Sequence, residues 1–437
     1  MKRRTLVLLS LWLMLALGCQ MAYSALRLTT PTPAKQIVST LVPTATPLPA
    51  ESMHTLVFAE LCDLVRENYV YLDFNGLDWD AECEAMTPRV VAAPDDESFY
   101  ALMREMIDDL GDDHSYFLSP QEAEEEDEAW FGTLDYVGVG VYVQRVDDKP
   151  YAVVLFPMPG GPAETAGIRP RDRILEIDGV PACCNADGSD NFDHMLGKEG
   201  TEVRLLVQTP GEAPREMTLT RAAIRMQMPI LSHRFLTPQG DIGYLLIPSL
   251  DDSTLGERTR KALRALLDEG PLAGLVLDLR PNYGGEYRQL LSILSLFTEG
   301  EGGYFLTRGG ERRTLTIEAD PIDGSQTMPL AVLIGPDTVS YAEVLAAVLQ
   351  WKGRAVLVGA PTEGNVETLH AHELADGSRL WLAEEAFFLP NGHTIEGVGL
   401  QPDLPVLADD WATYPLEEDP QITAALQWLE AQIGAGY

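Results

Sequence analysis

The chain has 437 residues, which is long for a single domain, so two or three domains are expected. Its 31 basic and 67 acidic residues give a net charge of −36, and such a surface repels nucleic acid and anionic lipid headgroups. Because no basic cluster lies beyond the first four residues, nucleic-acid binding is not expected.

The N-terminus has the pattern of a secretion signal. Three basic residues at positions 2–4 precede an apolar run over residues 6–17, which is too short to span a bilayer comfortably. Gly18 before Cys19 resembles a bacterial lipobox, in which the cysteine is acylated and becomes the mature N-terminus, although ordinary cleavage remains an alternative. We therefore expect a lipoprotein-type signal peptide over residues 1–19. The protein would lie outside the cytoplasm, either anchored to the cell membrane through Cys19 or secreted.

A linker is expected next, over residues 20–52. Residues 27–50 are rich in threonine and proline and almost uncharged, a composition that favours an extended spacer over a packed element. Such a spacer would hold the folded part of the chain away from a membrane anchor.

Four further cysteines follow Cys19. Cys62 and Cys83 could pair in an oxidising compartment, while the adjacent Cys183 and Cys184 could stay free or bridge elsewhere. None of the four has metal-site spacing, so structural roles are expected for them.

An N-terminal helical region is expected over residues 53–125. Apolar residues at three- and four-residue spacing predict helices over 54–69 and 97–110, the second after an acidic N-cap sequence. The second helix runs into LGDDHSYFLSP, which places His114 on a loop just past a helix end. A loop histidine is more often a solvent-exposed bystander than a catalyst. The acidic run over residues 122–130 is most simply a solvated connector.

A compact module of predicted strands follows, with limits at residues 130–225. Its order of strands and turns resembles a bacterial PDZ domain. The residues that carry the resemblance are Gly138-Val139-Gly140, Gly161-Pro162-Ala163 with Ala166-Gly167, Asp172 with Ile177-Asp178-Gly179, and Gly197 with Gly200-Thr201. A PDZ groove receives an extended peptide as an added strand and holds its terminal carboxylate with backbone N–H groups. The resemblance therefore implies a peptide-binding role for Val137, Gly138, Val139 and Gly140.

Strand and helix alternate from Asp241 onward. Strands are expected over 242–247, 274–279, 330–334 and 355–359, and helices over 254–267, 286–297 and 341–350. This alternation predicts an α/β domain with a largely parallel sheet. Sites in such sheets lie at the carboxyl ends of the strands.

Two turns at strand ends are candidate sites. Ser340 stands at the start of the predicted helix over residues 341–350, where backbone N–H groups and the helix dipole would stabilise an oxyanion formed by its attack on a carbonyl. The plainer alternative is that Ser340 only caps the helix. In the other turn, DLRPNYGG over residues 278–285, Gly284 and Gly285 can expose their N–H groups to a ligand, or simply form a tight turn.

These pieces, in this order, resemble the S41 peptidases, which include the carboxyl-terminal processing or tail-specific proteases and the tricorn core peptidases. The resemblance covers residues from about 53 to 407. It is carried by LGDDHSYFLSP (110–120), DLRPNYGG (278–285), VLIGPDTVSYAEVLAAVLQ (332–350), GRAVLVGAPTEGN (353–365) and DGSRLWLAEEAFFLPNGHTIEGVGLQPDLPV (376–406). It implies a crotonase/ClpP-like peptidase core over residues 230–410, an inserted PDZ domain, and a C-terminal helical tail over residues 411–437.

The resemblance implies roles residue by residue. Ser340 falls on the nucleophile, and Gly284 or Gly285, together with the amide of Tyr341, falls on the oxyanion hole. The general-base lysine of the serine–lysine branch falls on Asn365, whose amide nitrogen cannot accept a proton at ordinary pH. The sequence therefore departs from that branch at the base.

Tricorn-type relatives instead use a serine–histidine pair that a glutamate orients. Their histidine comes from the loop that matches LGDDHSYF, so the resemblance places the base at His114. An imidazole pKa suits proton transfer near neutral pH. Their glutamate falls on Glu384 or Glu385, which would face opposite sides of a strand, so only one of them can reach His114. Lys352, in a turn after the nucleophile helix, offers no replacement base.

No metal or other cofactor is expected, since His370 and His372 share a strand face but no third ligand is evident. We expect an exported, PDZ-bearing serine endopeptidase that cleaves protein or peptide substrates by acyl transfer. It would touch the membrane only through its lipid anchor. The alternative, raised by Asn365, is a catalytically inactive relative that binds peptides or apolar ligands.

Overall fold

The computed structural model describes residues 50–112, 114–130, 136–146, 149–183, 189–224, 227–408 and 410–435. The expected signal peptide, Cys19, nearly all of the expected linker and Cys184 lie outside these ranges, so the expectations for them stay predictions. No helix within the described ranges is long and apolar enough to cross a membrane.

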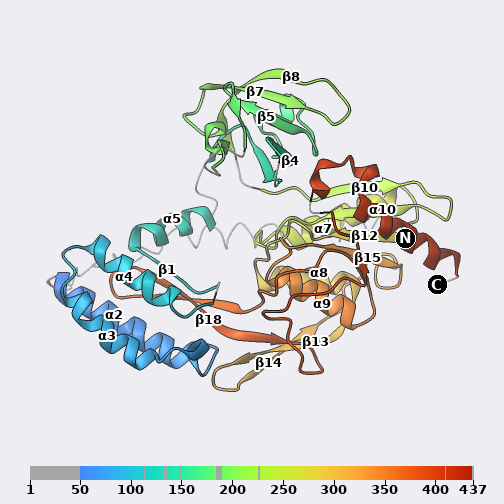
Figure 1. Ribbon diagram of the computed structural model, residues 1–437. Coiled ribbons are helices and arrows are strands. Elements are labelled where there is room, and N and C mark those ends of the chain that lie inside the picture. Colours follow the sequence, from blue (N-terminus) through green and yellow to red (C-terminus); the bar gives the residue numbers. More distant parts are fainter. Residues whose placement is uncertain are drawn as a thin grey trace, which may run out of the picture. The chain divides into compact units, whose positions relative to one another are not determined.

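The N-terminal part contains three helices, α2 (Ala50–Asn68), α3 (Trp79–Val91) and α4 (Asp96–Asp108) (Figure 1). Asp78 and Asp95 are the N-caps of α3 and α4, and each accepts a hydrogen bond from the backbone N–H three residues further on. A disulfide between Cys62 and Cys83 joins α2 to α3, a pairing that the sequence left open. The acidic run expected as a connector lies in a further helix, α5 (Pro120–Trp130).

These helices share a hydrophobic core with an antiparallel sheet. Its strands are β1 (Tyr116–Leu118), β18 (Arg379–Phe388), β13 (Gly300–Thr307) and β14 (Arg312–Ile317) in this order, with β17 (Thr368–Glu373) also paired with β18. Leu61, Phe99 and Met103 of the helices are buried in one cluster with Leu380 and Leu382 of β18. This packing holds both ends of the loop that joins α4 to β1.

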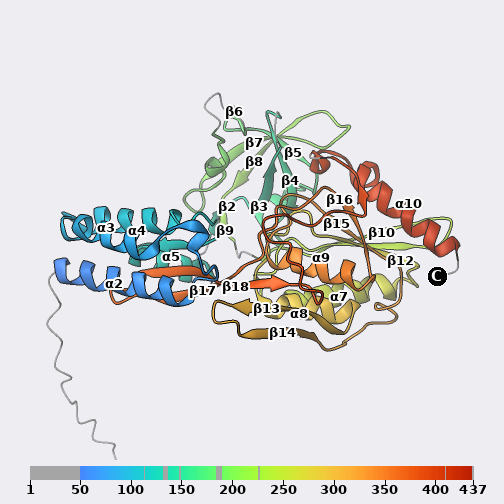
Figure 2. The same cartoon turned by 60° about the horizontal axis from the view of Figure 1, so that its bottom comes forward.

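The residues from 136 to 224 form a module of short strands (Figure 2). One antiparallel sheet has the order β3 (Val141–Arg145), β4 (Ala152–Pro157), β5 (Arg173–Ile177), β7 (Glu202–Gln208) and β8 (Arg215–Thr220), with β6 (Val180–Pro181) paired with β5. The remaining elements are β2 (Tyr136–Gly138), paired with β9 (Ala222–Ile224), and the short helix α6 (Pro162–Thr165). In β7 every second residue is buried, so one face of the sheet covers the core of the module.

The third region is built on a six-stranded sheet. Its strands are β10 (Leu231–Phe235), β11 (Ile242–Leu246), β12 (Gly274–Asp278), β15 (Leu330–Ile334), β16 (Val356–Gly359) and β19 (Leu404–Pro405), in this order. The β10–β11 pairing is antiparallel and all the others in this sheet are parallel.

The expectation of a largely parallel core is only partly met, because the protein has a mixed α/β fold. The six-stranded sheet is largely parallel, but the other sheets of the described chain are antiparallel. Two of the hairpins, β13–β14 and β17–β18, need only short turns, whereas parallel strands need long crossovers. The first hairpin lies between residues 298 and 329, where no strand was expected from the sequence. The crotonase/ClpP-like resemblance stays a prediction.

Helices cover both faces of the six-stranded sheet. They are α7 (Leu255–Asp268), α8 (Tyr287–Phe297) and α9 (Tyr341–Trp351) on one face and α10 (Pro420–Gly434) on the other. Leu275 and Leu277 of β12 pack with the first group, and Val276 packs with α10, as the two-residue period of a strand requires. Helix α9 is buried from Tyr341 to Leu349, so its first turn is held firmly in place.

A buried network of charges links the C-terminal segment to the turn after β12. Arg280 is 1% exposed, and its guanidinium contacts the carboxylates of Asp278 and Asp419. Asp419 also caps α10, and the ring of Trp411 lies 3.8 Å from the guanidinium. Arg171 of the strand module donates a hydrogen bond to the Trp411 carbonyl and lies 3.5 Å from Asp419. Because buried charges are costly unless paired, the turn at Arg280 depends on these distant residues.

Candidate active site

Ser340 lies between β15 and α9 with an unusual backbone conformation. Its φ is 58° and its ψ is −130°, a region that residues with a side chain rarely adopt. An ordinary N-cap residue has extended backbone angles, so helix capping alone does not account for this geometry. Ser340 N donates hydrogen bonds to the Asn365 carbonyl at 2.8 Å and to the Glu343 carboxylate at 3.2 Å. These contacts keep Ser340 in the strained conformation.

Glu343, one turn into α9, ties Ser340 to the loop that contains Asn365. Its carboxylate is fully buried and accepts hydrogen bonds from the Thr362 hydroxyl and from the N–H groups of Gly364 at 2.9 Å and Asn365 at 2.8 Å. Burial raises the pKa of Glu343, although these hydrogen bonds oppose the shift. The loop is therefore fixed beside the serine.

Gly284, the first glycine of the pair in the turn after β12, lies directly against Ser340. Gly284 has a φ of 93°, and a Cβ on it would lie 2.7 Å from Ser340 Cβ and 3.1 Å from Ser340 Oγ. The Gly284 N–H is occupied, since it donates to Asn282 Oδ1 at 2.9 Å. Within the described ranges, the N–H groups of Gly285 and Tyr341 have no acceptor. Of the two glycines that the sequence left open, Gly285 is thus the one with an available donor.

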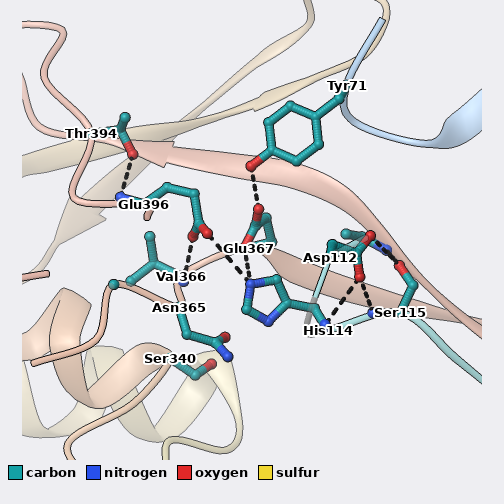
Figure 3. A network of polar contacts seen from close by, with 12 residues as sticks. Tyr71, Asp112, His114, Ser115, Ser340, Asn365, Val366, Glu367, Thr394 and Glu396 are labelled. Carbon is teal, nitrogen blue, oxygen red and sulfur yellow. Dashed lines mark hydrogen bonds and ion pairs between the residues drawn. The ribbon is translucent and has the colours of Figure 1, made fainter. Parts of the chain in front are cut away.

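His114 is not a solvent-exposed bystander. Its side chain is 8% exposed, and Nε2 lies 2.5 Å from Glu367 Oε2 and 3.4 Å from Glu396 Oε1. Asp112 holds the loop by accepting a hydrogen bond from His114 N at 3.0 Å. Figure 3 shows the other ring nitrogen, Nδ1, turned toward Ser340 and Asn365. The loop histidine and the helix-start serine, far apart in sequence, thus lie in the same part of the fold. In this view the Asn365 side chain lies between them, and no hydrogen bond among the described residues joins His114 to Ser340.

Glu367 and Glu396 each accept a hydrogen bond on the carboxylate oxygen that does not contact His114. The Tyr71 hydroxyl donates to Glu367 Oε1, and Val366 N donates to Glu396 Oε2 at 2.8 Å (Figure 3). Each carboxylate thus keeps one oxygen for its outer partner and directs the other at His114.

Burial and charge act against each other in this cluster. Burial alone would lower the pKa of His114, but the carboxylates of Glu367 and Glu396 outweigh it and raise the pKa to about 10. Burial raises the pKa of Glu396 to about 7, helped by the nearby Glu367 and opposed by His114. Burial alone would raise the pKa of Glu367, but its contacts with His114 and Tyr71 outweigh burial and lower the pKa. The imidazole is therefore charged at neutral pH, whereas the sequence suggested an ordinary imidazole pKa.

The expectation that Glu384 or Glu385 contacts His114 is wrong. Glu384 lies 2.5 Å from His372 Nε2, and Glu385 pairs with Arg313. Both glutamates are on β18, which lies between β17 and β13, so their side chains meet residues of neighbouring strands instead of the His114 loop. The acids at His114 come from the loops before β17 and after β18.

Sequence reasoning missed Glu367 and Glu396. Glu367 follows Asn365 by two residues, and Glu396 lies in the glycine-bearing stretch HTIEGVG. Single acids in loops carry little signal in a chain with 67 acidic residues, and only the folded structure brings these two together. Lys352, which was not expected to replace the base, donates a hydrogen bond to the Glu299 carbonyl at 2.7 Å and does not contact His114.

The expected peptide-binding residues lie around the start of the strand module. Val137 and Gly138 pair with β9, and Val139 and Gly140 form the turn into β3. Strand β3 is the outer strand of its sheet in the described chain, which leaves an edge to which a peptide strand could add. Gln144 on β3 donates to Asp337 Oδ2 at 3.1 Å, and Asp337 lies in the turn before Ser340.

Three family models match separate parts of the chain. Residues 241–406 match peptidase family S41, residues 153–209 match a PDZ domain, and residues 54–108 match the tricorn protease C1 domain. A carboxyl-terminal-processing protease of Synechocystis sp. is 29% identical over 380 residues, which are 86% of each chain.

Two further similarities agree with these matches. A probable CtpA-like serine protease of Staphylococcus aureus (strain COL) is 30% identical over 302 residues, 69% of this chain and 58% of the relative, so the match spans less than two thirds of that relative's length. The solved structure of a photosystem II D1 C-terminal processing protease is 27% identical with a TM-score of 0.55, and the match covers 82% of this chain and 94% of that one. The chain therefore belongs to peptidase family S41, as a member with a PDZ domain and a tricorn C1 domain.

Proposed function

We propose that the chain is a serine endopeptidase that cleaves protein substrates by acyl transfer, with Ser340 as the nucleophile and His114 as the general base. One observation carries the proposal: two carboxylates hold His114 Nε2, and Nδ1 is turned toward a serine with strained backbone (Figure 3). Membership of family S41 and the similarity to proteins named as processing proteases support it.

In this mechanism, Nδ1 of neutral His114 removes the proton from Ser340 Oγ as the oxygen attacks the scissile carbonyl. Glu396 accepts a hydrogen bond from Nε2–H, and Glu367 Oε2 forms an ion pair with the same nitrogen, so the two carboxylates keep the lone pair on Nδ1 and stabilise the imidazolium that forms. The imidazolium then gives its proton to the leaving amine, and the acyl group remains on Oγ as an ester. A water molecule, deprotonated by the same nitrogen, hydrolyses the ester and frees the serine.

The amides of Gly285 and Tyr341 are proposed as the oxyanion hole. Both N–H groups lack an acceptor within the described part of the chain. Tyr341 follows Ser340 in the chain, and Gly285 follows Gly284, which lies against Ser340. Donors of this kind act on the charge that develops in the transition state, and each contributes about 10²–10³ to turnover. Gly284 would instead supply the space that Ser340 needs.

We assign substrate selection to the PDZ domain and the location to the outside of the cytoplasm. The open edge of β3 and its contact with the turn before Ser340 favour capture of an extended substrate segment next to the nucleophile. Substrates that differ only in a free or an amidated C-terminus test this. Amidation should slow cleavage of long substrates and leave short peptides unaffected. Equal rates for free and amidated long substrates would contradict carboxylate capture.

A fluorophosphonate probe tests the central proposal, because it labels a serine only when the serine is activated. Labelling is expected in the full chain, with none in Ser340→Ala and little in His114→Ala. Glu384→Gln, which changes a carboxylate away from the cluster, should label as the parent does. A folded parent chain that stays unlabelled would favour the second candidate, an inactive peptide-binding protein. That candidate is motivated by Asn365 at the position expected for the family's lysine.

A further inference from the structure

His114, Glu367 and Glu396 form a convergent set of three donor atoms. Their Nε2, Oε2 and Oε1 atoms lie within 4.8 Å of one another. The side chains are only 8%, 1% and 18% exposed. Glu367 Oε2 is buried and receives no hydrogen bond of ordinary geometry from the described residues, although it is aimed at Nε2 as an ion pair. A buried carboxylate oxygen without a hydrogen bond indicates a position where another electropositive partner fits.

The surroundings of the three atoms have the features of a metal-ligand shell. Tyr71 binds the outer oxygen of Glu367, and the amide of Val366 binds the outer oxygen of Glu396. Outer partners of this kind orient metal-binding carboxylates. Two carboxylates also face one imidazole, so with both carboxylates ionised a buried negative charge remains even when the ring is protonated, and a divalent cation would compensate it.

We propose that His114, Glu367 and Glu396 form an inhibitory site for a divalent transition-metal ion of the Zn²⁺ type. One imidazole nitrogen and two carboxylate oxygens suit Zn²⁺, with a water as fourth ligand. Ligand atoms around tetrahedral Zn²⁺ lie roughly 3.4 Å apart, given metal–ligand distances of about 2.1 Å. The Nε2–Oε1 separation of 3.4 Å already matches, and Glu367 needs to move back by about 1 Å. Ca²⁺ and Mg²⁺ fit poorly, because they prefer shells of oxygen.

The inhibitory effect rests on the proposed function and follows from the two ring nitrogens. A metal on Nε2 displaces the proton there to solvent and uses its lone pair. The neutral ring then carries its single proton on Nδ1, the nitrogen turned toward Ser340. A protonated Nδ1 cannot accept the proton of Ser340 Oγ. Metal binding and base catalysis at His114 therefore exclude each other.

Binding is measured on the full chain with Ser340→Ala, which keeps all three ligands and needs no activity. Co²⁺ should bind once per chain, give the visible absorption of a four-coordinate ion, and be displaced by Zn²⁺. Calorimetry should show proton release as a heat that depends on the buffer. The added substitution His114→Ala should abolish binding, and the isosteric Glu396→Gln should weaken it at least tenfold.

The matched control is Glu384→Gln, which removes the carboxylate beside His370 and His372 and should leave binding unchanged. Absence of Co²⁺ binding, or binding that persists in His114→Ala and disappears in Glu384→Gln, would overturn the site.

With the active chain, Zn²⁺ should block probe labelling of Ser340 and a chelator should restore it. If Zn²⁺ binds but does not prevent labelling of Ser340, the metal site stands and only the inhibitory mechanism is overturned. A parent chain inactive even in chelator would instead reject the proposed function and leave the binding result standing.

Discussion

The imidazole of His114 is the side chain on which the proposed chemistry depends most directly. His114→Ala should lower kcat by about 10²–10⁴, the usual contribution of a general base. Glu384→Gln is the matched control and should leave kcat unchanged, because Glu384 pairs with His372. Steady-state kinetics on folded variants measures both. Full activity of His114→Ala would rule out its role as base.

The pH profile follows from the raised pKa of His114. Only the neutral ring accepts a proton, and the pKa is about 10, so kcat/KM should rise through the alkaline range, reach half its maximum near that value and level off above it. A lysine base would give a similar rise. Glu367→Gln separates the two, because loss of this carboxylate lowers the pKa of His114 and moves the rise to lower pH. A profile that does not respond to Glu367→Gln would contradict the assignment.

Gly284 provides a second prediction at the scale of single residues. Gly284→Ala places a Cβ 2.7 Å from Ser340 Cβ, whereas the same change at Gly310 meets nothing within 4 Å. Both glycines have positive φ, at 93° and 79°, so both substitutions should cost about 1–2 kcal/mol of stability. Denaturant unfolding should show a loss in both variants, larger in Gly284→Ala because its Cβ also meets Ser340, while only Gly284→Ala should lose probe labelling of Ser340. Equal labelling in the two variants would argue against close packing at the nucleophile.

At the scale of elements, the segment after α2 reaches the candidate site through Tyr71. Its hydroxyl donates to Glu367, and a hydrogen bond to a charged group contributes about 1.5–3 kcal/mol. Tyr71→Phe should therefore lower kcat about tenfold. Glu367 stays ionised in the alkaline range without this hydrogen bond, so the alkaline rise in activity should keep its position.

The control for Tyr71 lies in the same helical region. Tyr100 on α4 donates to Asp376 Oδ2 at 2.9 Å, away from the cluster. Tyr100→Phe should change neither kcat nor the pH profile. If both variants lose activity to the same extent, Tyr71 supports the fold and does not position Glu367.

The elements also show which parts of the fold and the candidate site could be predicted from the sequence. Ser340 and His114 were identifiable because short contiguous motifs surround them, and the strands of the six-stranded sheet were identifiable from apolar runs. Glu367 and Glu396 were not, because their approach to His114 depends on where two loops lie after β17 and β18 have paired. The local sequence pattern carries no information about the pairing of β17 with β18. For the same reason, it favoured the glutamates of the long strand β18.

At the scale of the whole molecule, the expected lipid anchor determines where the protein works. Cys19→Ser should release the chain in soluble form, since stable anchoring needs acyl chains that only a lipidated cysteine carries. Detergent partitioning of membranes and supernatant measures the change. Retention of the variant in the detergent phase would contradict lipidation at Cys19.

The buried pairing of Arg280 with Asp419 determines when the turn after β12 can complete its contacts during folding. A ribosome makes the chain from its N-terminus, so His114 and Ser340 emerge well before Asp419. Until then Arg280 lacks one of its two acids, and the turn that carries Gly284 and Gly285 is left with a poorly compensated charge. We therefore expect the turn that we propose to bind the oxyanion to reach its final geometry only after Asp419 has been synthesised and has packed against Arg280.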